Sequence, residues 1–119
     1  MNVPKMLRSF KFAFQGIWVL MHENNARFHF FATIVVILTG FLVGLSNTEW
    51  SIISIMIGLV WAAEAFNTAI EKLCDFVTTA QHPIIGKVKD LSAAAVLIIS
   101  CIAVIIGIII FLPKILAKL

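Results

Sequence analysis

Three long stretches without a charged side chain decide what this chain can fold into. They cover residues 28–45, 50–63 and 91–112. A helix needs about 20 mostly apolar residues to cross the hydrocarbon of a bilayer, and in lipid only helices and closed barrels satisfy their own backbone hydrogen bonds. The sequence therefore predicts an all-α integral membrane protein with one domain over residues 1–119. Its spans are expected at about 28–45, 50–77 and 91–112.

The N-terminal segment is expected to lie on the membrane surface. Residues 5–21 form an amphipathic helix whose three basic residues, Arg8 among them, share one side, while aromatic and aliphatic residues occupy the other. This pattern is typical of an interfacial helix. The alternative is a short first span, which the regular spacing of the cations disfavours. A polar link follows over residues 22–27, where Glu23 and Arg27 have the spacing of an ion pair on a helix surface.

Polar segments are predicted to connect the spans. Ser46–Glu49 forms a tight turn, which makes the first two spans an antiparallel hairpin. Residues 78–90 form a loop, because Pro83 and Gly86 stop the neighbouring helices. Pro113 is expected to end the third span.

The charges indicate how the chain is oriented. Charged residues make up 13% of the chain and hydrophobic residues 61%, whereas a soluble domain has about 25% charged residues. Cytoplasmic segments carry the excess of Lys and Arg, so the N-terminus and the end of the second span are expected in the cytoplasm. We expect these cations to set topology and contact phosphates, with no nucleic-acid partner. Two cations, Lys114 and Lys118, are expected on the opposite side. Seven are expected on the cytoplasmic side: Lys5, Arg8, Lys11, Arg27, Lys72, Lys87 and Lys89.

The second span ends in a stripe of polar residues. At 100° per residue, Glu64, Asn67, Glu71 and Asp75 fall within an arc of about 80°. Carboxylates at membrane depth are costly and normally face a bundle interior or an aqueous cavity. A solvated helix end explains Asp75 equally well. Glu64, in contrast, directly follows fourteen residues without a charge, so we expect it to be functional.

These residue types suggest phosphoryl transfer. Carboxylate oxygens suit Mg²⁺, which takes one or two protein carboxylates and completes its shell with water and phosphates. A partly desolvated carboxylate such as Glu64 suits proton transfer from an alcohol. Neither G-x-x-x-x-G-K-[ST] nor G-x-G-x-x-G occurs in the chain. The alternative of a small oligomeric proton or cation channel with Glu64 as its ion site leaves the other polar residues unexplained.

Two segments carry a resemblance to a known family. Residues 64–75 read E-A-F-N-T-A-I-E-K-L-C-D, and residues 89–98 read K-D-L-S-A-A-A-V-L-I. They resemble the signature E-x-x-N-[ST]-A-I-E-x-x-x-D followed by K-D-x-x-x-A-A-V-L of the small prokaryotic diacylglycerol kinases. The resemblance implies a homotrimer of three-span subunits in the bacterial plasma membrane. It also implies active sites shared between subunits on the cytoplasmic side, with Mg²⁺ and ATP as cofactor and phosphoryl donor.

The resemblance also implies roles for individual residues. Glu64 would be the catalytic base, and Glu23 and Glu71 the metal ligands that also contact the nucleotide. Asn67, Asp75 and Ala93 would bind the acceptor or shape the site. The remaining nucleotide contacts would be Arg8, Gln81, His82, Lys89 and Asp90.

The acceptor is expected to be a lipid alcohol. His29 stands where members that use diacylglycerol tend to have an acid, and Ala93 replaces a Ser that they often have. The hairpin around Gly40–Trp50 and the ending Phe111–Lys114 look more like the Gram-positive branch, whose acceptor is undecaprenol. We therefore expect ATP-dependent phosphorylation of undecaprenol, with diacylglycerol as the alternative. The small residues Gly40, Gly44 and Ala93–Ala95 offer surfaces for close association between subunits.

Overall fold

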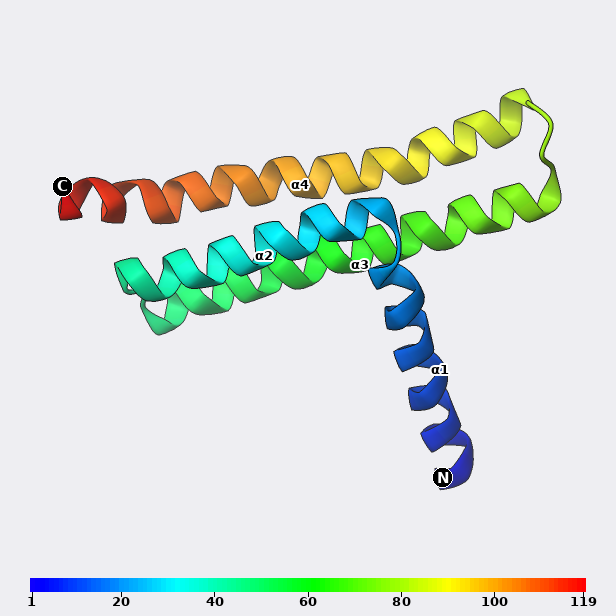
Figure 1. Ribbon diagram of the computed structural model, residues 1–119, viewed down its shortest axis with the longest axis horizontal. Coiled ribbons are helices and arrows are strands. Elements are labelled where there is room, and N and C mark those ends of the chain that lie inside the picture. Colours follow the sequence, from blue (N-terminus) through cyan, green and yellow to red (C-terminus); the bar gives the residue numbers. More distant parts are fainter.

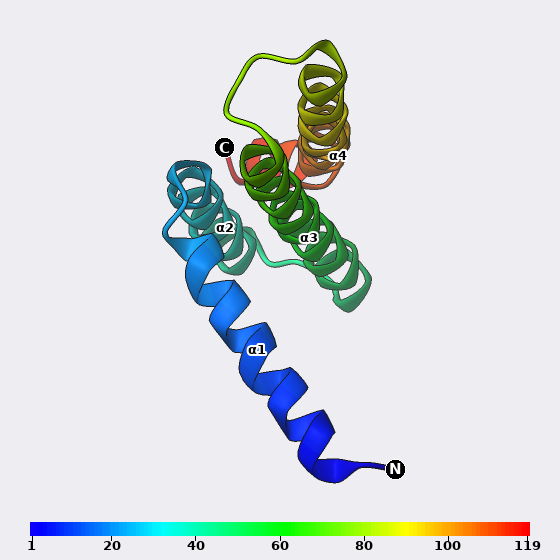
Figure 2. The same ribbon diagram turned by 90° about the vertical axis from the view of Figure 1, so that its right-hand side faces the viewer.

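Four helices account for nearly the whole chain. The computed structural model describes residues 1–119, which form α1 (Val3–Met21), α2 (Asn24–Val43), α3 (Asn47–Val77) and α4 (Pro83–Lys118). Helices α2, α3 and α4 run side by side, and α1 leads away from them at a steep angle (Figures 1 and 2). The last three helices are long and apolar enough to cross a membrane. The predicted all-α fold with three candidate spans is confirmed.

The link between α1 and α2 is shorter than predicted. Only His22 and Glu23 separate the two helices, so the predicted polar link over residues 22–27 is wrong. Glu23 has an extended backbone at the N-cap of α2, and residues 24–27 contain no Gly or Pro to interrupt the helix that follows. The spacing that suggested a Glu23–Arg27 pair is not used, because Glu23 pairs with Lys72 of α3 instead.

The connection between α2 and α3 is held by local hydrogen bonds. Gly44 ends α2 with a φ of 75°, a conformation that glycine adopts without a steric penalty. The Ser46 hydroxyl accepts from the backbone N–H of Glu49 at 3.1 Å, and the Glu49 carboxylate accepts from the backbone N–H of Ser46 at 2.9 Å. This capping box starts α3 at Asn47. The predicted antiparallel hairpin is confirmed (Figure 1).

Helix α4 extends past both of its predicted ends. It begins at Pro83, after His82 caps it by accepting from the backbone N–H of Ile84 at 3.1 Å. A proline suits this first position because no helical partner exists for its missing N–H. The loop is therefore residues 78–82, and Gly86 lies inside the helix. Pro113 also lies within α4; membrane helices tolerate proline where local adjustments satisfy the freed backbone groups.

Gly40 lets α2 and α3 approach closely beside their hairpin. A Cβ atom at this position would lie 2.6 Å from Cη2 of Trp50 and 3.0 Å from Cδ1 of Leu45. The ring of Phe41 also meets that of Trp50, with centroids 4.9 Å apart. Gly40 is buried inside the subunit and Gly44 serves as a helix end. The expectation that this glycine pair offers a surface to other subunits is therefore wrong for Gly40 and stays a prediction for the exposed Gly44.

We predict that Gly40→Ala destabilises the protein by about 1–3 kcal/mol, as overpacking commonly does. The added methyl group meets the rigid indole of Trp50. Gly58→Ala is the matched control, because its Cβ would have no neighbour within 4 Å and alanine is the better helix former. Unfolding of both variants in mixed micelles measures the difference. Equal stability would contradict the close approach at Gly40.

Candidate functional site

The polar stripe of α3 runs from the interior of the bundle to its surface. Glu64 is only 2% exposed and Asn67 only 5%. Glu71 and Asp75 are exposed, towards the end of α3 that leads into loop 78–82. The predicted continuation of the helix through all four residues is confirmed. The stripe thus joins a buried carboxylate to a solvent-facing one along a single helix.

Glu64 faces a histidine from the neighbouring helix. Nε2 of His29, on α2, lies 3.4 Å from Oε2 of Glu64, and the two side chains are 12% and 3% exposed. The indole N–H of Trp61 donates to the Thr33 hydroxyl at 3.0 Å, and that hydroxyl donates to the backbone carbonyl of His29 at 2.7 Å. The Trp61 ring lies beside the imidazole, with centroids 5.9 Å apart. The imidazole of His29 therefore lies between the Glu64 carboxylate and the neighbourhood of the Trp61 ring.

Sequence reasoning considered His29 only as a sign of substrate choice. Its signal was present, because a histidine inside an otherwise uncharged span is a polar group at membrane depth. The sequence does not show that His29 and Glu64 meet, since this depends on how α2 and α3 are rotated against each other.

Asn67 has a buried partner on α4. The Ser92 hydroxyl donates to Oδ1 of Asn67, and both residues are buried. Sequence reasoning singled out Ala93 at this point of the chain, but Ala93 is exposed on the outer side of α4. Within the subunit, Ser92 rather than Ala93 is therefore the residue that contacts Asn67.

Two ion pairs connect α3 to the start of α2 and to α4. Lys72 lies 3.1 Å from Glu23, and Lys89 lies 2.6 Å from Asp75. All four side chains are at least one-third exposed, so such pairs contribute little to stability. Their value here is positional, because the first pair holds Glu23 against α3, the helix that also carries Glu71.

Glu23 and Glu71 form no metal cage by themselves. Nowhere in the chain do three His, Cys, Asp or Glu side chains gather closely enough to hold a metal ion. A magnesium ion that arrives with a nucleotide needs only one or two protein carboxylates. Glu23 and Glu71 can supply two carboxylate oxygens, which are the ligand type that Mg²⁺ prefers.

A polar pocket surrounds the loop between α3 and α4. Its volume is about 580 Å³. The predicted nucleotide residues Gln81, His82 and Lys89 line it, together with Asp75. The other four predicted nucleotide residues do not line it. Glu23 and Glu71 are absent from its lining, Asp90 is exposed, and Arg8 is on α1, which points away from the loop (Figure 1).

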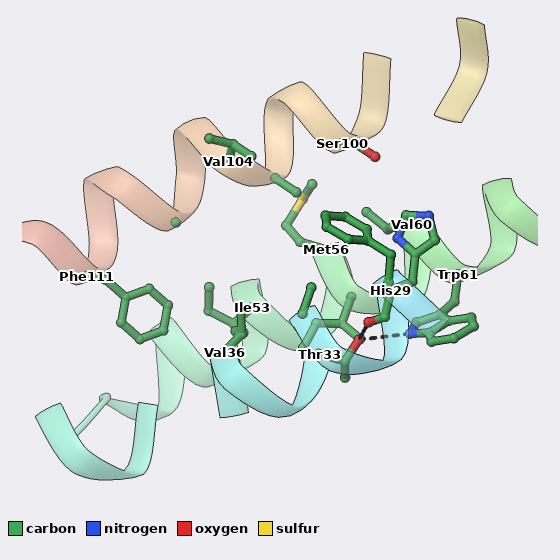
Figure 3. A pocket seen from close by; sticks show the side chains of 15 residues that line it. His29, Thr33, Val36, Ile53, Met56, Val60, Trp61, Ser100, Val104 and Phe111 are labelled. Atoms are coloured by element: carbon green, nitrogen blue, oxygen red, sulfur yellow. Dashed lines mark hydrogen bonds between the residues drawn. The ribbon is translucent and has the colours of Figure 1, made fainter. Parts of the chain in front are cut away.

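An apolar pocket of about 290 Å³ lies between α2, α3 and α4. Figure 3 shows His29 and Trp61 at one end of it and Phe111 at the other. Eleven of its fifteen lining residues are hydrophobic. The polar residues His29, Thr33 and Ser100 lie away from Phe111 (Figure 3), and His29 is the one that contacts Glu64. This distribution suits an amphiphile with one polar end.

A family model for prokaryotic diacylglycerol kinases matches residues 11–111. The chain belongs to the prokaryotic diacylglycerol kinase family. It is 43% identical over 114 residues to the undecaprenol kinase of Bacillus subtilis, covering 95% of this chain and 93% of that protein. It is 31% identical to the diacylglycerol kinase of Synechocystis, over 96% of this chain and 66% of that protein. The diacylglycerol kinase of Haemophilus influenzae is 34% identical, with coverages of 85% and 86%.

Membership confirms the family resemblance of residues 64–75 and 89–98 and the conclusion that the chain is a lipid kinase. A channel is therefore not its function. The roles of the individual site residues are a separate question, since membership alone assigns none of them.

Proposed function

We propose that this kinase transfers the γ-phosphoryl group of ATP to the hydroxyl of undecaprenol, giving undecaprenyl phosphate. The observation that carries the proposal is the buried Glu64 carboxylate, which lies behind the polar end of an apolar pocket between three candidate spans. The pocket suits the hydrocarbon chain of a lipid alcohol. The relative named for undecaprenol shares 43% identity, and those named for diacylglycerol share 31% and 34%. Diacylglycerol is the second candidate.

In this proposal Glu64 takes up the proton that the acceptor hydroxyl loses. The carboxylate is buried and lies 3.4 Å from His29, next to the polar end of the apolar pocket. Asn67, Asp75 and Ala93 shape the surroundings. The nucleotide is bound around the polar pocket by Gln81, His82 and Lys89, with Asp90 following Lys89 in the chain. Arg8 would contact it from a neighbouring subunit, because within one subunit α1 points away from the pocket (Figure 1).

Glu23 and Glu71 would hold a magnesium ion. Bound with ATP, the ion neutralises charge on the phosphate oxygens. The Glu23–Lys72 pair supports this assignment, because it keeps Glu23 beside the helix that carries Glu71. In this proposal the Lys72 ammonium, which pairs with Glu23, turns to a phosphate oxygen when the ion binds.

We place the protein in the plasma membrane of a bacterium. Loop 78–82, the polar pocket and the His29 end of the apolar pocket would face the cytoplasm. The excess of Lys and Arg at this end supports it. Helix α1 would lie on the membrane surface, as its steep angle to the three spans allows (Figure 2). Among its residues only Leu20 is buried within the subunit.

We expect the active enzyme to be a homotrimer with sites completed between subunits. Within one subunit Glu71 makes no ion pair, no metal cage forms and Arg8 points away from the polar pocket. Neighbouring subunits would supply the missing contacts. The exposed Ala93 and Ala95 on α4 allow close helix approach.

The function is tested by incubating the protein in vesicles with Mg-ATP and either undecaprenol or diacylglycerol. We predict faster turnover of undecaprenol. Glu64→Gln should lower kcat by about 10²- to 10⁴-fold, as loss of a general base does, while nucleotide binding persists. Preference for diacylglycerol would overturn the acceptor, and near-normal turnover in the variant would remove Glu64 from its role.

The metal assignment predicts that Glu23→Ala and Glu71→Ala each raise the Mg²⁺ concentration for half-maximal activity by at least about tenfold. Changes around metal ligands commonly cost that much affinity. Glu49→Ala is the matched control, because Glu49 pairs with Lys114 at the opposite end of the bundle. Mg²⁺ titrations of the three variants decide the question. Unchanged curves for Glu23→Ala and Glu71→Ala would show that these carboxylates bind no metal.

The shared-site proposal predicts complementation between inactive chains. A Glu64→Gln chain mixed with a Glu23→Ala or a Lys89→Ala chain should regain part of the wild-type activity, because some mixed trimers would contain one intact site. Differently tagged chains purified through both tags ensure that only mixed oligomers are assayed. Absence of recovery in every pairing would mean that each site is built within one subunit.

A further inference from the structure

The apolar pocket runs lengthwise along the three candidate spans. Its lining follows one face of α4 from Ser100, at the polar end, to Phe111 at the other end (Figure 3). These two residues are about 16 Å apart along the helix, at a rise of about 1.5 Å per residue. The hydrocarbon of a bilayer is about 30 Å thick. The pocket therefore extends over roughly half the depth that a lipid chain occupies.

The pocket is open towards the bilayer between α2 and α4. Two of its lining residues, Phe28 on α2 and Val104 on α4, are 70% and 62% exposed. No Asp, Glu, Lys or Arg lines it. Lipid tails are as apolar as these side chains, so a hydrocarbon chain can enter sideways between the two helices without passing a charge.

Selection in this pocket depends on shape. A chain that moves from the bilayer into an apolar pocket gains little free energy from burial, because the surroundings that it leaves are equally apolar. The walls therefore discriminate between chains through the space that they leave. At the far end this space is bounded by the half-buried ring of Phe111.

Gly107 leaves space in the wall of the pocket one turn before Phe111. It is the only glycine between residues 91 and 112, and glycine is a poor helix former. A Cβ atom here would have no neighbour within 4 Å, so no close helix contact requires this glycine, in contrast to Gly40. The missing side chain instead leaves the pocket open at this level.

The length of α4 can be compared with that of an isoprenoid chain. An extended chain advances about 3.3–3.6 Å per three bonds, so an isoprene unit of four bonds spans about 4–5 Å. Along α4, Gly107 lies about 10 Å from Ser100, and Phe111 lies about 16 Å from it. Counted from the hydroxyl, about two units therefore reach Gly107, and about three to four reach Phe111.

We propose that Gly107 and Phe111 determine which acceptor chains the kinase admits. This inference rests on the proposed function. Gly107 leaves room for the chain beyond about its second isoprene unit, and Phe111 ends the part that the subunit encloses. The rest of a long polyprenol leaves through the opening between α2 and α4 into the bilayer. The enzyme thus selects its acceptor by the units nearest the hydroxyl, whatever the total length of the chain.

A set of alcohols of increasing length tests this assignment in vesicles with Mg-ATP. Gly107→Leu should lower kcat/KM for farnesol and undecaprenol by at least about tenfold, because the misfit of a single methylene in an apolar pocket commonly costs that much. Geraniol, whose chain ends near Gly107, should keep its kcat/KM, and the KM for ATP should not change. Leucine is a better helix former than glycine, so the variant should keep α4 intact.

Ile109→Phe is the matched control, because Ile109 is 66% exposed and does not line the pocket. It should leave the kcat/KM of every alcohol as in the wild type. If Gly107→Leu lowered turnover of all alcohols equally and altered the oligomer seen by cross-linking, the pocket would hold a second copy of the chain, and the inference would be overturned. No loss with any alcohol would overturn it too. A wild-type chain inactive on every lipid alcohol would instead refute the proposed function.

Photolabelling provides a measurement that depends on neither turnover nor a variant. A farnesol analogue with a diazirine at the end of its chain should label wild-type α4 between Gly107 and Phe111. A geraniol analogue with the same group should label it between Ser100 and Gly107, and undecaprenol should compete with both. Mass spectrometry of the peptides locates the label. Labels confined to residues outside the pocket would overturn the inference even in an enzyme that phosphorylates undecaprenol.

Discussion

A chain inside a bilayer has no water to satisfy its backbone, so every N–H and C=O group in the hydrocarbon must find a partner within the protein. This requirement accounts for most of the architecture. Of the 95 backbone hydrogen bonds, 86 lie within helices, so the helices do not depend on one another for backbone pairing.

Because the backbone hydrogen bonds are made within each helix, the polar contacts between helices are made by side chains. Glu64 faces His29 on α2, and Asn67 faces Ser92 on α4. No buried side-chain nitrogen or oxygen lacks a hydrogen-bond partner. An unpaired polar group costs more in a low-dielectric interior than at a surface. The residues suited to chemistry are therefore also those that align α3 with its two neighbours.

The sequence was informative where a signal is local and limited where it depends on two helices at once. Long uncharged runs and the spacing of Glu64 and Asn67 predicted the candidate spans and the buried stripe. Pro83 was misread because a proline fits both a loop and the first turn of a helix. Ser92 was missed because α4 is apolar on all sides, so its periodicity does not tell which face meets α3. His29 was noticed, but its contact with Glu64 was not predicted, because the sequence does not show how α2 is rotated against α3.

The contact between Gly40 and Trp50 has a consequence for how such a chain can diverge. The two positions are separated by the whole turn of the hairpin, yet one side chain occupies the space that the other leaves empty. A larger residue at position 40 is compatible with the hairpin only if the residue at position 50 becomes smaller. A change of side-chain size at either position therefore alters the space available to the other, which couples the two ends of the hairpin.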